Sequence, residues 1–94
     1  MLGLRNKKAS LEATLQDLET RRSGVVRRSE AAAMKAEEAI AAQRAFLVDT
    51  NGEDAAIAKR LADACRRTAD ERAALDDAAR TLSEQVAQAK DALE

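Results

Sequence analysis

The apolar positions of this chain are arranged as mirror images about one turn-forming segment, residues 49–54, with the sequence Asp-Thr-Asn-Gly-Glu-Asp. Apolar side chains stand at equal distances before and after that segment. Clear mirrored pairs are Leu11 with Leu93, Leu18 with Val86, and Leu47 with Ile57. Two helices that fold back on each other bring such pairs side by side. The pattern therefore predicts an all-α fold, a long antiparallel helical hairpin that forms a two-helix coiled coil.

Within each half of the chain, apolar residues recur in alternating steps of three and four, which is the heptad repeat of a coiled coil. The large apolar residues of the expected helix or oligomer seam are Leu11, Leu15, Leu18, Val25, Ile40, Phe46, Leu47, Ile57, Leu61, Leu75, Leu82, Val86 and Leu93. Ile40 and Leu47 belong to a neighbouring row that also includes Val26 and Ala33. We expect the apolar stripe to broaden onto this row, because a nearly straight helix drifts away from a strict seven-residue repeat.

The sequence predicts a single helical-hairpin domain over residues 1–94. Helix one is expected at about residues 4–48, the turn at 49–53 and helix two at about 53–93. Thr50-x-x-Glu53 has the pattern of a capping box for the second helix. Asn51-Gly52 offers residues that accept the left-handed conformation needed to leave the first helix. A break at Ser23-Gly24, which gives three shorter helices, remains as an alternative, although the heptad continues through Gly24 without a change of phase.

The composition favours long helices but provides a weak core. There is no Pro, Trp or Tyr, and 23 of the 94 residues are Ala. Polar or charged residues interrupt the seam at Arg22, Ser29, Gln43, Thr68 and Arg72. Burial contributes about 25 cal/mol per Å², and ordering each residue costs about 1–2 kcal/mol. We therefore expect the hairpin to associate into a helical bundle or ring, as a homo-oligomer or with a helical protein partner.

The residues that usually carry chemistry are scarce. The chain has no His, which removes the commonest general base and metal ligand. One cysteine, Cys65, excludes an internal disulfide and a cysteine-based zinc site. Neighbouring carboxylates on a helix point about 100° apart and do not converge; these are Glu37-Glu38, Asp70-Glu71 and Asp76-Asp77. The sequence predicts no catalytic residue, no cofactor, no metal and no small-molecule ligand, and hence a protein that is not an enzyme.

Basic residues of the first half lie along one edge of the expected helix, at Lys7, Arg21, Arg28 and Lys35. The net charge is −1, so acidic partners are available. The antiparallel arrangement is expected to bring Glu71 near Arg28 and Lys35, and to bring Glu12 and Glu19 near Lys90. Charge pairing across the two helices is therefore the simplest interpretation of this edge.

Arg21, Arg27 and Arg28 are the candidates for nucleic-acid contact. Phosphate binding needs basic side chains of this kind. Single-strand binders also need stacking aromatic residues, and readers of duplex DNA need a docking motif. The chain shows no such motif, and Phe46 is its one aromatic residue. Nucleic-acid binding is therefore an alternative that the sequence does not favour.

No apolar run approaches the ~20 residues of a membrane span, and the N-terminal segment lacks the apolar centre of a signal peptide, so the expected location is the cytoplasm. Arg exceeds Lys and Ala is abundant, a composition associated with GC-rich bacterial or phage genomes.

In architecture, the pattern resembles the oligomerisation hairpin of phage small terminase subunits and the stalk or chaperone hairpins of type III export systems. We expect a non-enzymatic oligomerisation or adaptor protein. The resemblances imply a packaging adaptor or an export stalk as alternatives.

Overall fold

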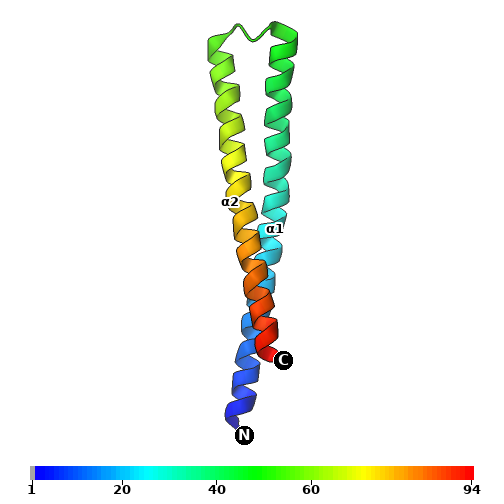
Figure 1. The fold of residues 1–94 in the computed structure, drawn as a ribbon, viewed down its shortest axis with the longest axis vertical. Coiled ribbons are helices and arrows are strands. Elements are labelled where there is room, and N and C mark those ends of the chain that lie inside the picture. Colours follow the sequence, from blue (N-terminus) through cyan, green and yellow to red (C-terminus); the bar gives the residue numbers. More distant parts are fainter. Residues whose placement is uncertain (1) are drawn as a thin grey trace.

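A computed structural model describes residues 2–94 as two long helices, α1 over Leu2–Thr50 and α2 over Ala55–Leu93. The helices run antiparallel and lie side by side, with the chain reversal at one end (Figure 1). The resulting rod measures 74 × 15 × 14 Å. The predicted all-α antiparallel hairpin is confirmed. We call residues 30–74 the tip half, and residues 2–29 with 75–94 the base half.

Helix α1 continues through Ser23 and Gly24 without a break. The three-helix alternative is therefore wrong. A glycine inside a helix costs ~1 kcal/mol relative to alanine, and the long runs of strong helix formers on both sides of Gly24 offset that cost.

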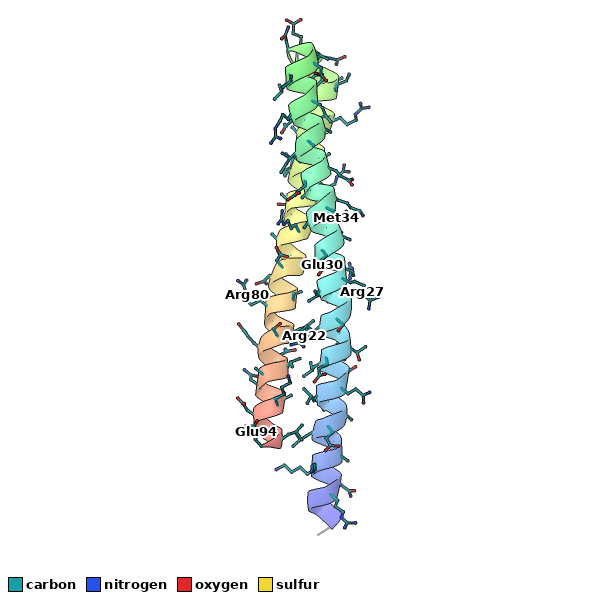
Figure 2. All side chains as sticks on the ribbon, turned by 90° about the vertical axis from the view of Figure 1, so that its right-hand side faces the viewer. Arg22, Arg27, Glu30, Met34, Arg80 and Glu94 are labelled. Atoms are coloured by element: carbon teal, nitrogen blue, oxygen red, sulfur yellow. The ribbon has the colours of Figure 1, made fainter. Side chains whose placement is uncertain are left out.

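The two helices wind around each other along the rod. At the tip they stand side by side in one view and overlap in the view turned by 90°, and at the base the reverse holds (Figures 1 and 2). Winding of this kind keeps a seven-residue repeat in contact with the partner helix over many turns.

The seam between α1 and α2 follows the heptad positions. Its fully buried members are Leu75 and Val86 in the base half, and Ala32 and Ala36 in the tip half. The other large apolar residues of the predicted seam that are at least partly buried are Leu11, Leu15, Leu18, Val25, Phe46, Ile57, Leu61, Leu82 and Leu93.

Ile40 and Leu47 lie outside this seam, with 47% and 56% of their surfaces exposed. The contact between α1 and α2 therefore does not broaden onto this row. The expectation of a broadened stripe assumed a straight helix whose apolar row drifts towards the partner. Because the helices wind around each other, the drift is removed and the row that includes Ile40 and Leu47 stays on the outer surface.

The reversal at residues 51–54 is built by local hydrogen bonds and two left-handed residues. Asn51 has a φ of 62° and Gly52 a φ of 71°, which confirms their predicted conformation. A Cβ on Gly52 would stand 2.7 Å from Cδ2 of Leu47. The positive φ favours glycine at this position, and any other side chain would also displace the Leu47 side chain.

The predicted capping box is wrong in its residues. Asp54 is the N-cap of α2, and its Oδ1 accepts hydrogen bonds from the backbone N–H groups of Ala56 at 3.1 Å and Ile57 at 3.2 Å. The Thr50 hydroxyl instead donates to the Phe46 carbonyl at 2.6 Å and remains part of α1. A carboxylate is a strong acceptor at the positive end of a helix, so α2 begins at Ala55 and α1 extends to Thr50.

Two hydrogen bonds join polar side chains of the two helices. The Ser29 hydroxyl donates to Oδ1 of Asp76 at 2.5 Å, and the Cys65 thiol donates to Oε1 of Gln43 at 3.6 Å. Ser29 and Asp76 stand at nearly equal distances from the turn, as the mirror pattern predicts. Gln43 and Cys65 are displaced from the mirrored positions by four residues, or about one helical turn.

The ion pairs of residues 2–94 each lie within one helix. They join Arg21 to Asp17, Arg66 to Asp63, and Arg80 to Asp77. The expected pairs between helices, Glu71 with Arg28 or Lys35 and Glu12 or Glu19 with Lys90, are not formed. Partners three or four residues apart on one helix are in reach whatever the register of the hairpin, and exposed pairs between helices gain too little to order two long side chains.

Candidate functional site

Among the residues whose side chains the structure describes, every exposed large apolar residue lies on α1. They are Val26, Met34, Ile40, Leu47 and Val48, all on α1. Met34 is 66% exposed and Val48 is 73% exposed. Over residues 55–93, α2 exposes none of its large apolar side chains. The exposed apolar surface is therefore concentrated on the tip half of α1.

These side chains share a surface with two charged residues. At about 100° per residue, the helical rotation places them within an arc about 140° wide. We call this surface the α1 tip face and define it by Met34, Glu37, Ile40, Ala41, Arg44, Leu47 and Val48. It lies beside the seam, so the contact with α2 leaves it open.

A shallow hollow lies at the centre of the α1 tip face. Glu37, Ile40, Ala41 and Arg44 line it. Within residues 2–94, neither Glu37 nor Arg44 forms an ion pair with another residue. The hollow is therefore lined by two apolar residues, one acidic group and one basic group, and the two charges form no ion pair within the hairpin.

A second hollow lies at the open end of the base half, where α1 extends past the end of α2 (Figure 1). Its lining residues are Lys7, Lys8, Leu11, Ala92 and Leu93. The presence of Leu11 and Leu93 in one hollow places these mirrored residues next to each other. This hollow is the end of the seam and carries no acidic side chain beside its two lysines.

The three arginines considered for nucleic-acid contact are exposed, but they do not form one surface. Arg21 is paired with Asp17 at 2.8 Å. Arg27 projects away from α2 (Figure 2) and lies about 100° around the helix from Arg28. The structure therefore brings Arg21 and Arg28 to one edge of α1 and leaves Arg27 outside that edge.

No set of three or more potential metal-ligating side chains converges within residues 2–94. Cys65 is a free, partly buried thiol. The hydrogen bond from Arg80 to Asp77, followed by the charge of that carboxylate, raises the pKa of the Arg80 guanidinium above its usual value, so Arg80 stays protonated. Neither described helix is long and apolar enough over any stretch to cross a membrane.

The sequence pattern placed Ile40 and Leu47 in the seam and did not identify Met34 or Val48 as exposed apolar residues. A signal for them was present, because Met34, Ala41 and Val48 are spaced by seven residues. No protein-family model, no curated protein and no solved structure matches this chain.

Proposed function

We propose that this protein is a non-enzymatic coiled-coil adaptor that associates through its helix faces, with other copies of itself and with a helical protein partner. The observation that carries the proposal is the concentration of exposed Met34, Ile40, Leu47 and Val48 on the α1 tip face. Contiguous exposed apolar surface marks interaction sites in soluble proteins.

The small number of buried residues in the seam supports the same function. Only Ala32, Ala36, Leu75 and Val86 are fully buried among residues whose side chains are described. A narrow seam provides limited stabilisation, and association adds burial at about 25 cal/mol per Å² of apolar surface. A hairpin with this composition gains stability whenever its apolar outer face is covered by another helix.

We place the adaptor in the cytoplasm. Its single cysteine, Cys65, cannot form a disulfide within the chain, and its thiol donates to Gln43. Free thiols persist in reducing compartments, which supports this location.

Sedimentation analysis over a range of protein concentrations tests the proposal. We expect association that persists at about 0.5 M salt, because burial of apolar surface is not screened by ions while exposed charge contacts are. Ile40→Ser combined with Val48→Ser is expected to weaken association on the order of tenfold or more. Ala31→Ser combined with Ala42→Ser, on the opposite side of α1, is the matched control and should leave it unchanged.

A nucleic-acid function makes the opposite prediction. Binding to DNA would fall steeply with added salt, because phosphate contacts release counterions. It would also depend on Arg21, Arg27 and Arg28. Tight DNA binding by a chain that stays monomeric, lost when these three residues are changed to Ser, would replace the adaptor function with the packaging alternative.

A further inference from the structure

The spacing of Glu37 and Arg44, the two charged residues of the α1 tip face, suits pairing of this face with a second copy of itself. Glu37 and Arg44 are seven residues apart on one helix face, which is two turns or about 10 Å. The side chains carry opposite charges, and neither forms an ion pair within residues 2–94. A 180° rotation about an axis perpendicular to α1, through the midpoint between these two residues, exchanges the positions of Glu37 and Arg44.

The midpoint of that exchange lies between Ile40 and Ala41, at the centre of the hollow that Glu37, Ile40, Ala41 and Arg44 line. A second copy laid antiparallel on the α1 tip face about this point would place its Arg44 against Glu37 and its Glu37 against Arg44. The same rotation would place Ile40 against Ala41 of the second copy and Met34 against its Leu47. Charge and apolar surface are thus self-complementary under one two-fold rotation, as an isologous interface requires.

We propose that the α1 tip face binds a second copy of this chain, antiparallel, about a two-fold axis between Ile40 and Ala41, with two reciprocal Glu37–Arg44 contacts. This inference rests on the proposed function and names its partner and geometry. Opposite charges at equivalent heptad positions fix the orientation and register of an antiparallel pair, while the exposed Met34, Ile40, Leu47 and Val48 provide the burial.

The geometry has a consequence for the shape of the dimer. The two α1 helices overlap over residues 31–50, which is about 30 Å of helix. Two rods of 74 Å joined in this way give a particle roughly 110–120 Å long. Two rods packed along their whole length would keep the length of one. Small-angle X-ray scattering therefore separates the overlapping-tip dimer from a full-length four-helix bundle.

Charge reversal tests the reciprocal contacts. Glu37→Arg places two arginines against each other on both sides of the axis, and Arg44→Glu does the same with two glutamates. Each variant is expected to raise the dimer dissociation constant by about tenfold or more. The double variant Glu37→Arg with Arg44→Glu restores opposite charges and should return the constant to within about threefold of the original.

Glu38→Arg is the matched control, because it makes the same charge change on an exposed neighbour that lies about 100° further around the helix. Circular dichroism checks that every variant remains helical. The proposal is overturned if Glu38→Arg weakens the dimer as much as Glu37→Arg does, or if the double variant remains weak. Association that persists unchanged in all of these variants overturns this geometry and leaves the adaptor function standing. A chain that stays monomeric overturns both.

A cysteine placed near the axis provides an independent test. In a Cys65→Ala background, Ala41→Cys should form a disulfide between two copies on mild oxidation, because each copy's residue 41 lies next to the axis. Ala87→Cys, exposed on the base half of α2, should not. A disulfide that forms at residue 87 as readily as at residue 41, or at neither position, contradicts the overlapping-tip dimer.

Discussion

The base half and the tip half of the hairpin differ in how many of their large apolar residues are exposed. The fully buried residues of the base half are Leu75 and Val86, whereas those of the tip half are Ala32 and Ala36. The tip half exposes Met34, Ile40, Leu47 and Val48, all on α1. Among the side chains that the structure describes, the base half exposes one large apolar residue, Val26, whereas the tip half exposes four. The tip half keeps Phe46, Ile57 and Leu61 partly buried in the seam.

We therefore propose that one heptad repeat serves two purposes along a single rod. In the base half the burial of large side chains stabilises the hairpin. In the tip half small alanines in the seam provide less burial per residue, and the larger side chains next to them are free to make contacts with another helix. We therefore expect substitutions in the base half to change the stability of the monomer, and substitutions on the α1 tip face to change association.

The strongest test compares two valines. Val86→Ala removes two methyl groups from a side chain that is 1% exposed, and we expect it to lower the free energy of unfolding by about 2 kcal/mol. Val48→Ala makes the same change on the exposed tip face. It should alter the stability of the dilute monomer by no more than about 0.5 kcal/mol, in the stabilising direction set by helix propensity. Denaturant unfolding at low protein concentration measures both. Equal losses of unfolding free energy in the two variants would contradict the proposed difference between the base half and the tip half.

The heptad pattern predicted the hairpin and the seam because burial between two wound helices depends on periodicity alone. It did not predict the α1 tip face, since the side on which Ile40 and Leu47 lie depends on how far the helices wind around each other. The choice of Asp54 over Thr50 as N-cap depends on competition between adjacent acceptors, which a local motif does not resolve. The ion pairs formed within helices because partners such as Asp17 for Arg21 are near in every register.

The turn that separates the halves is expected to be the next most sensitive feature. Gly52→Ala adds a Cβ to a residue with a φ of 71°, 2.7 Å from Cδ2 of Leu47, and should cost about 1–2 kcal/mol. Gly24→Ala is the matched change within α1, where a new Cβ meets nothing within 4 Å. It should stabilise the hairpin by about 0.5–1 kcal/mol. Thermal unfolding of the two variants checks both signs. A loss at Gly24 would mean that the base half needs flexibility there.

Replacing a charged seam residue of the base half should strengthen that half further. Arg22 is partly buried and lies between the helices (Figure 2), with Leu82 at the mirrored position. Arg22→Leu should stabilise the hairpin on the order of 1 kcal/mol, because it adds apolar burial while losing a guanidinium. Arg27→Leu, on the exposed side of α1, should leave unfolding of the monomer unchanged. A marked loss of stability in Arg22→Leu would show that Arg22 has a specific acidic partner.

The smallest expected effect concerns the contact where the two halves meet, the hydrogen bond from Ser29 to Asp76. A hydrogen bond of this kind contributes about 0.5–1.5 kcal/mol. Ser29→Ala removes it, but alanine is the better helix former and suits a partly buried position, so the net change should stay within about 0.5 kcal/mol. If the large residues of the base half set the register, spin labels at residues 11 and 93 should remain about 10–15 Å apart in this variant, as expected for helices packed at ~8–10 Å. If the distance between the labels increases, or its distribution broadens, while stability is unchanged, the hydrogen bond from Ser29 to Asp76 sets the register. The large residues of the base half would then stabilise the hairpin without setting the register of its helices.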